Sequence, residues 1–270
     1  MSKKKIELLG FKRDKWIYNI IIPVLSIITF LLIWELLVRY GIIPTRYLPR
    51  PSELINTFID KLSNPKPEGS TLPMNILSSL RISLSGFLTA VIIGVPLGWF
   101  MGWYKPIDRF VKPLFETIRP IPPIAWIPLT ILLLGIGIRA KVYIIFFAAF
   151  VPCVINAYTG IRLADITLIN VAKTCGANNF QIFVKVGIPS SFQMVFAGIR
   201  IALGASWTTL VAAEMLAAGS GLGYMILMGR QFARPDLIVL GMLIIGSIGA
   251  LMAIVLSKIE QRMEVWRFKK

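Results

Sequence analysis

Five long stretches of this 270-residue chain contain no Asp, Glu, Lys or Arg. They are residues 16–34, 82–104, 120–138, 142–161 and 237–257, each at least 19 residues long. A helix of about 20 apolar residues crosses the hydrocarbon layer of a bilayer and satisfies its own backbone hydrogen bonds there. The stretches therefore predict an all-α integral membrane protein. A sixth span is expected within residues 186–213, where Arg200 is the one charged residue.

The six spans are expected at about 17–38, 76–103, 114–137, 142–161, 190–216 and 236–257, within one domain over residues 17–257. If the N-terminus is cytoplasmic, seventeen basic residues flank the spans on the cytoplasmic side and nine on the other. This bias predicts that the tails, residues 1–16 and 258–270, are both cytoplasmic. The net charge of +16 is thus explained by membrane topology, without nucleic acid; contact of the basic N-terminal tail with anionic lipid is the alternative for that tail.

The chain lacks the usual reactive groups of an enzyme. It contains no histidine, no phosphate-binding loop of the G-x-x-x-x-G-K-[ST] type and no zinc motif. Cys153 falls in a span and Cys175 in a cytoplasmic loop, so no structural disulfide is expected. We predict no catalytic residue, no metal site and no bound cofactor. A membrane enzyme is therefore the functional hypothesis with the least support.

An orderly polar insert, residues 164–189, separates the fourth and fifth spans. Asp165 is expected to cap a helix that ends near Thr174, and Gly176 suits a left-handed turn. Asn178 is expected to cap a second helix, which Pro189 ends as the fifth span begins. The insert predicts a docking site for another protein; the alternative is an amphipathic connector lying on lipid.

Three further segments suggest local structure. Apolar residues within 51–62 recur at intervals of three and four, which predicts an amphipathic helix at the outer surface. Gly94, Gly98 and Gly102 predict close helix packing, with a pore-lining face as the alternative. The third span holds four prolines between Pro120 and Pro128, so its helix must be broken. The break either lines a translocation path or is an ordinary kink.

Charged residues inside spans are costly and therefore mark candidate sites. Arg200 lies deepest, and its guanidinium could bind an anion in a cavity. The alternative is a pair with a carboxylate, or with carbonyls freed by the prolines. Trp207 and Glu214 follow at steps of seven and share its helix face, although core packing also explains Trp207. The candidate path residues are Arg81, Arg119, Pro123, Trp126, Arg200, Trp207 and Glu214.

The insert resembles the coupling motif of ABC-importer permeases, E-A-A-x-x-x-G followed by a proline thirteen residues later. Gly176 and Pro189 keep this spacing and Ala172 matches the second alanine, whereas Asn170 and Val171 replace the first two residues. The resemblance implies that the insert couples the chain to an ATPase subunit. The residues implied in coupling are Asn170, Ala172, Lys173, Thr174, Gly176, Ala177 and Pro189.

More of the chain, roughly residues 20–265, is similar to the nitrate, sulfonate and taurine branch of these permeases. The similar segments are 48–52, 119–129, 198–204, 211–215 and 221–223. The resemblance implies a type I importer (MetI-like) fold with six spans and a coupling helix, in a bacterial cytoplasmic membrane. It also implies a second permease copy, an extracytoplasmic substrate-binding protein, and ATP with Mg²⁺ in a separate ATPase subunit.

The expected cargo is a small, anionic solute such as a sulfonate, taurine or nitrate. Relatives that carry a pyrimidine or riboflavin-type vitamin precursor look similar, so such a cargo is the alternative. A secondary transporter that works without an ATPase subunit is an alternative hypothesis from a different class of transport protein. Such transporters show broken helices in corresponding places of two halves, and one proline-broken span is seen here.

Overall fold

A computed structural model describes residues 21–217 and 219–263 of the chain. In these two ranges every regular element is helical, as the sequence predicted. η2 is a 3₁₀ turn and η3 a π turn, a wider turn with i→i+5 bonds. The elements are α2 (Ile22–Arg39), α3 (Pro51–Ser63), α4 (Leu72–Trp103), α5 (Lys105–Ile118), η2 (Pro123–Trp126), α6 (Ile127–Leu134), α7 (Ile138–Arg162), α8 (Ile166–Thr174), α9 (Asn179–Ile182), η3 (Phe183–Gly187), α10 (Ile188–Ala217), α11 (Leu222–Gln231) and α12 (Pro235–Met263).

Five helical segments of the described chain are long and apolar enough to cross a membrane: residues 22–39, 72–103, 138–162, 179–216 and 235–263. A sixth crossing requires α5 and the η2–α6 segment to act together, although they meet at 85°. Five of the six expected spans thus correspond to single helical segments. Residues 17–20, expected to begin the first span, lie outside the described residues.

The core is a three-helix arrangement in which α7 packs between α4 and α10. A Cβ atom added at Gly98 or Gly102 of α4 would collide with α7, and one at Gly94 would lie 3.0 Å from Cys153 Cβ. On the other side of α7, a Cβ at Gly198 of α10 would lie 2.5 Å from Asn156 Cβ. The glycines of the second span therefore serve helix packing, and the pore-lining alternative is not supported.

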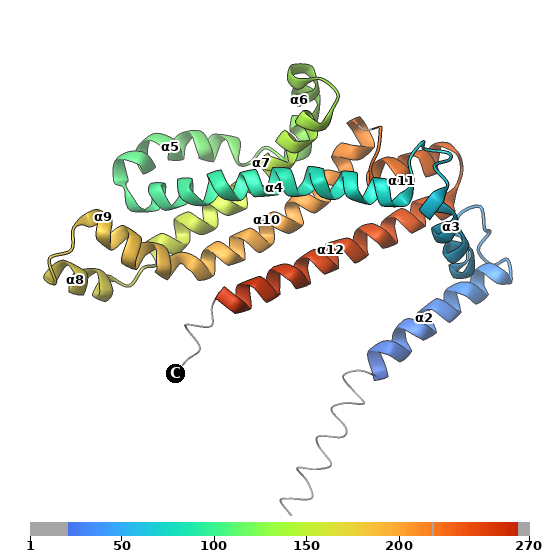
Figure 1. The fold of residues 1–270 in the computed structure, drawn as a ribbon, viewed down its shortest axis with the longest axis horizontal. Coiled ribbons are helices and arrows are strands. Elements are labelled where there is room, and N and C mark those ends of the chain that lie inside the picture. Colours follow the sequence, from blue (N-terminus) through green and yellow to red (C-terminus); the bar gives the residue numbers. More distant parts are fainter. Residues whose placement is uncertain (1–20, 218, 264–270) are drawn as a thin grey trace, which may run out of the picture.

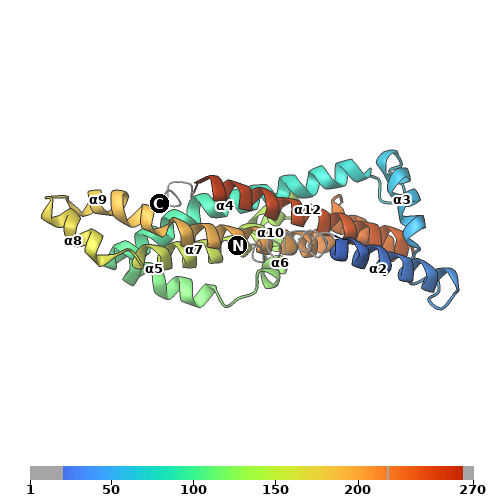
Figure 2. The ribbon, with the colours of Figure 1, turned by 90° about the horizontal axis from the view of Figure 1, so that it is seen from below.

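The molecule is elongated, with two distinct ends (Figure 1). Helices α8 and α9 project at one end, here called the insert end. Helices α3 and α11 lie at the other, called the cap end, and the view in Figure 2 shows the same separation. The core helices run between the two ends, so the insert and the cap lie on opposite sides of any membrane that the core crosses.

Helix α2 stands apart from the core (Figure 1). Most of its apolar side chains are exposed. Val38 is its buried residue. Part of its attachment to the cap comes from Glu35, whose carboxylate accepts hydrogen bonds from the backbone N–H and the hydroxyl of Ser52 at the start of α3. A carboxylate at a helix N-terminus is favoured by the exposed N–H groups and the helix dipole. The expected amphipathic helix at 51–62 is thus observed as α3.

The third span differs from the expectation of one element over 114–137. Residues 105–118, mostly expected to be loop, form helix α5, and the chain breaks at 119–122 before η2 begins. The prolines explain the break, because each removes a donor and blocks the preceding turn. The charged residues of 105–116 recur with a helical period, so they lie along one face of an amphipathic helix.

Pro189 does not end a helix, contrary to the expectation. The helix runs from α9 through η3 into α10, so residues 179–216 form one continuous segment. The backbone N–H of Ile188 bonds to the carbonyl of Phe183, five residues back, immediately before the proline. This wider turn changes the hydrogen-bond register where proline cannot donate, which lets the helix continue.

Candidate functional site

The insert is a helix–turn–helix whose turn is fixed by backbone hydrogen bonds. Asp165 caps α8 by accepting a 2.7 Å bond from Thr167 N, as predicted. At the other end, Ala177 N bonds to Ala172 O at 3.0 Å and Gly176 N to Lys173 O at 2.9 Å. This is the Schellman pattern, which requires the left-handed backbone found at Gly176, with φ +82°. The proposed coupling residues therefore build the turn itself.

The second helix of the insert also begins as predicted. Asn178 Oδ1 accepts a 2.8 Å bond from Gln181 N, and Gln181 Oε1 accepts a 2.9 Å bond from Asn178 N. Such a reciprocal capping box fixes the start of a short helix. Of the remaining coupling residues, Asn170 accepts a bond from the Thr174 hydroxyl through its carbonyl at 3.0 Å.

The insert presents apolar side chains that nothing in the described chain covers. No residue of α8, described in full, is buried. Ile166, Val171 and Phe180 are 67%, 55% and 63% exposed. A cavity of about 630 Å³ opens between α8 and the start of α10, and Ala172, Lys185 and Pro189 are among its lining residues. A protruding, apolar and hollowed surface of this kind is typical of a docking site.

A second cavity, here called the hinge cavity, lies where α5 breaks from η2. Its volume is about 450 Å³ and its walls come from the break, α7 and α10. Two of the predicted path residues, Arg119 and Pro123, line it. A third, Trp126, stacks at 5.1 Å on Phe147, which is itself a lining residue. The proline break therefore does border a hollow space.

The polar lining of the hinge cavity includes three residues that the sequence did not single out. They are Asn156 of α7 and Thr208 and Thr209 of α10. Uncharged polar residues in apolar spans gave only a weak signal. The signal that could have found them is their place on the helix faces turned towards the proline break, which needs the fold to be known.

Arg119 is the cation of the hinge cavity. Its Nε lies 3.1 Å from a carboxylate oxygen of Glu116, one turn earlier, and the two side chains are 43% and 42% exposed. An exposed pair of this kind contributes about 0.2–1 kcal/mol, so it is readily exchanged for another anion. The guanidinium also carries two terminal nitrogens in the fork geometry that binds oxyanions with two hydrogen bonds.

Arg200 is placed differently from the expected path. It forms an ion pair with Glu260 of α12 and does not belong to the lining of the hinge cavity. The carboxylate-pair alternative is therefore the one observed. The sequence had assigned Glu260 to the tail at 258–270, whereas α12 continues to Met263. Trp207 is buried, and its indole N–H donates a 3.0 Å bond to Ile245 O, which agrees with core packing.

Glu214 is fully buried in a group of side chains that we call the polar clasp (Asn75, Ser79 and Glu214). Glu214 accepts bonds from the Ser79 hydroxyl at 2.7 Å and from Gly223 N at 2.9 Å. Ser79 and Asn75 in turn accept bonds from Leu222 N and Gly221 N, each at 2.9 Å. The clasp fastens the start of α11 to α4. Glu214 thus has a structural role here, and Arg81 lies exposed elsewhere on α4.

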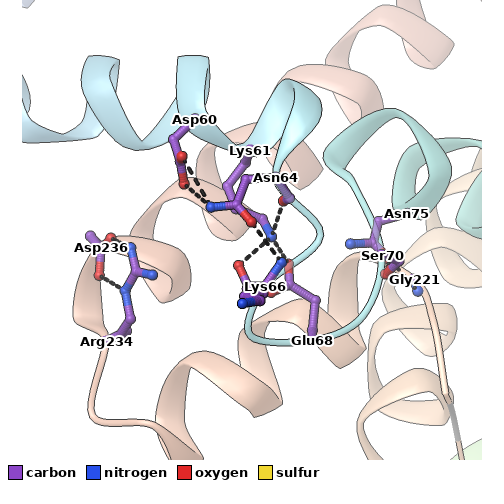
Figure 3. A network of polar contacts seen from close by, with 10 residues as sticks. All are labelled: Asp60, Lys61, Asn64, Lys66, Glu68, Ser70, Asn75, Gly221, Arg234 and Asp236. Atoms are coloured by element: carbon purple, nitrogen blue, oxygen red, sulfur yellow. Dashed lines mark hydrogen bonds and ion pairs between the residues drawn. The ribbon is translucent and has the colours of Figure 1, made fainter.

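A buried ion pair closes the cap end (Figure 3). Lys61 Nζ lies 2.8 Å from Glu68 Oε1, and both side chains are fully buried. Lys61 also donates to the carbonyls of Asn64 and Lys66, at 2.9 and 3.0 Å, so its charge is well compensated. The sequence had treated Lys61 as one of several outer basic residues, because its partner follows in a segment that reads as a loop.

The cap is also tied to the last helix. Asp236, in the first turn of α12, accepts a 3.0 Å bond from the Thr57 hydroxyl of α3. It also accepts a 2.6 Å bond from Arg234 (Figure 3). The hydrogen bond to Asp236 raises the pKa of Arg234 above its already high usual value. The bond from Thr57 to Asp236 holds α3 against the start of α12.

Comparisons with known proteins agree with this architecture. Residues 94–265 match the family described as binding-protein-dependent transport system inner membrane component. The chain is 37% identical to an ABC transporter permease protein of Methanocaldococcus jannaschii, over 99% of this chain and 98% of that one. It is 29% identical to the taurine transport system permease protein of Escherichia coli, over 96% of each. Other relatives, 29–30% identical, are named for aliphatic sulfonates (Bacillus subtilis), bicarbonate (Synechocystis) and nitrate (Leptolyngbya laminosa).

The fold has a solved counterpart. An inward-facing structure of the MetNI methionine ABC transporter superposes with a TM-score of 0.59 at 19% identity, covering 71% of this chain and 95% of that one. At this identity the likeness shows the fold, which is the expected MetI-like permease fold. Together with the family match and the relatives, it shows that the chain belongs to the inner-membrane permease subunits of binding-protein-dependent ABC importers.

Proposed function

We propose that this permease forms the translocation path for a small anion and that Arg119 contacts the anion in the hinge cavity. The observation that carries the proposal is the position of Arg119 at a hollow bordered by a broken span. Its one close carboxylate partner among the described residues, Glu116, is exposed and weakly held. A guanidinium in such a place offers an oxyanion paired hydrogen bonds.

The names of the relatives support an anion. Sulfonates, bicarbonate and nitrate are anions, and taurine carries a sulfonate group. These names favour an anionic cargo over a pyrimidine or riboflavin-type precursor. Arg200, which the sequence marks as a candidate for the anion contact, is less suitable because Glu260 already neutralises its charge.

The permease is proposed to work within a larger assembly. Two copies would line one path, and a substrate-binding protein would deliver the cargo at the cap end. A separate ATPase subunit, which holds ATP and Mg²⁺, would dock on the insert. The exposed apolar residues of α8 and the hollow beside them support this docking. The assembly would lie in the cytoplasmic membrane, in contact with its lipids, with both tails and the insert in the cytosol.

The anion proposal is tested by uptake into proteoliposomes that contain the complete assembly. The cargo panel is taurine, an alkyl sulfonate, nitrate, bicarbonate and a neutral pyrimidine. For the transported anion, Arg119→Gln should lower uptake about tenfold to a hundredfold, because charge-assisted hydrogen bonds contribute about 1.5–3 kcal/mol. Arg119→Lys should retain part of the activity.

Arg39→Gln is the matched control, because Arg39 lies exposed at the end of α2. It should leave uptake within about twofold of the wild type. Unchanged uptake in Arg119→Gln, or transport of the neutral pyrimidine alone, would refute the anion site.

A further inference from the structure

An aromatic cluster joins the insert to the junction of α4 and α5. We call it the aromatic joint (Phe100, Trp103, Tyr104 and Phe183). Phe183 lies in the π turn and is 3% exposed. Its ring centroid lies 5.5 Å from that of Phe100 and 5.7 Å from those of Trp103 and Tyr104. These distances are those of favourable aromatic pairs.

Two further contacts hold the joint together. The indole N–H of Trp103 donates a 3.2 Å bond to the side-chain oxygen of Asn179, the first residue of α9. Gly187, at the end of the π turn, lies so close that an added Cβ would be 2.9 Å from the Trp103 ring. Because packed contacts of this kind do not deform freely, a displacement of α9 must displace the end of α4 as well.

Tyr104 is the single residue between α4 and α5, and its backbone is extended, with φ −103° and ψ 107°. Helix α5 is loosely held: none of its residues, all of which are described, is buried. A short connection next to a loosely packed helix is a suitable hinge. The far end of α5 leads directly into Arg119 and the hinge cavity.

We propose that Phe183 and Trp103 are positioning residues that pass movement of the insert to α5. When the insert moves, the aromatic joint turns α5 about Tyr104 and changes the hinge cavity at Arg119. The inference rests on the proposed docking of the ATPase subunit on the insert. It goes beyond that docking, because it assigns a particular route from the docked surface to the cavity.

The continuous helix of residues 179–216 offers a second route, directly into α10. The π turn at Phe183–Gly187 distinguishes the two routes, because it places a buried aromatic ring sideways against the α4–α5 junction. π turns within α-helices occur frequently at functional sites. Movement of α10 alone would leave the joint without a role in coupling.

The first test measures transport per ATP hydrolysed by the complete assembly in proteoliposomes. Phe183→Leu removes the ring interactions, and Asn179→Ala removes the bond to Trp103 from an exposed position. Both should lower transport per ATP about threefold to tenfold, the size expected for residues that carry coupling. Phe110→Leu is the control, since Phe110 is 77% exposed on α5 and should have no effect.

The second test follows α5 directly. A spin label at Phe110→Cys, with Cys175→Ser and Cys153→Ala, reports the distance between the two α5 helices of the assembly. In the otherwise wild-type protein this distance should change when ATP is bound, and Phe183→Leu should abolish the change. If Phe183→Leu shows a normal distance change and normal transport per ATP, the proposed role of the aromatic joint is wrong.

Co-purification of the ATPase subunit separates the joint from the docking proposal. The variants should retain the ATPase subunit while losing coupling. If Phe183→Leu and Asn179→Ala no longer retain the ATPase subunit, these residues belong to the docking surface, and the proposed role of the aromatic joint is wrong. If the wild-type protein does not retain an ATPase subunit through its insert, the docking proposal fails first.

Discussion

The hydroxyl of Ser79 makes two buried hydrogen bonds that connect α4 to α10 and α11. It donates to Glu214 and accepts from the backbone of Leu222, so it bonds both neighbours of the turn between α10 and α11. Ser83, one turn further along α4, is equally buried, but its hydroxyl has no hydrogen-bond partner among the described residues. The two serines look alike in the sequence and differ entirely in their surroundings.

Ser79→Ala is expected to destabilise the protein by about 1–3 kcal/mol, because it leaves the buried N–H of Leu222 and a carboxylate oxygen of Glu214 unsatisfied. Thermal unfolding of the purified protein, followed by intrinsic fluorescence, measures the loss. Ser83→Ala is the matched control and should be neutral or slightly stabilising. Equal effects of the two substitutions would contradict the role of the clasp.

Local chemistry was predictable from the sequence at the residue scale. The caps at Asp165 and Asn178 and the positive φ at Gly176 all depend on residues within three positions, and all three are observed. Contacts between distant residues were not predictable. The bond from Ser79 to Glu214 spans 135 positions, so the sequence showed two polar residues in apolar spans without showing that they meet.

The turn of the insert is the element on which the proposed coupling depends. Gly176→Val places a β-branched residue at φ +82°, a conformation that costs such a residue about 1–2 kcal/mol or more. The turn should change, and ATP hydrolysis should continue while uptake falls. Parallel uptake and ATPase assays of the reconstituted assembly measure this. Full coupling would show that the turn is not needed.

Gly246→Val provides the control for that experiment. Gly246 lies in α12 with no atom within 4 Å of an added Cβ, so the larger side chain is accommodated. Membrane insertion of both variants should match the wild type. Poor insertion of Gly176→Val alone would indicate that the turn is needed for folding.

Spans that lie in long uncharged stretches are predictable from the sequence, whereas the bounds of broken helices are not. The spans that became α4, α7 and α12 had long uncharged stretches. Most of helix α5 lies outside the expected spans because residues 105–116 carry several charges. Pro106 and Pro113 are both accommodated in the helix. The continuation through Pro189 was missed because a π turn has no recognisable sequence signature of its own.

The two ends of the molecule should face opposite compartments. The insert carries Cys175, which is exposed, whereas the other cysteine, Cys153, is buried in α7. A membrane-impermeant maleimide should therefore label Cys175 in inside-out vesicles that contain the permease without its ATPase subunit, and leave it unlabelled in intact spheroplasts. Cys175→Ser should abolish the labelling. Labelling from the outside would reverse the proposed topology.

The sequence predicted an all-helical membrane protein, but it did not determine whether the third span crosses the membrane as one helix. Five uncharged stretches and the segment around Arg200 indicated six crossings, and the described chain has five long segments and one bent pair. Whether a broken segment crosses depends on what packs around its free backbone groups, which composition does not reveal. The hinge cavity likewise arises only when α7 and α10 are placed beside the break.

The buried pair of Lys61 and Glu68 also bears on the order of assembly. Both residues belong to one short segment, so the pair can close soon after that segment has left the translocon, while the ribosome is still making later helices. The bond from Thr57 to Asp236 spans 179 positions and has to await synthesis of α12. A stalled nascent chain ending before residue 235 should already protect Lys61 from amine reagents, although the bond from Thr57 to Asp236 cannot yet form.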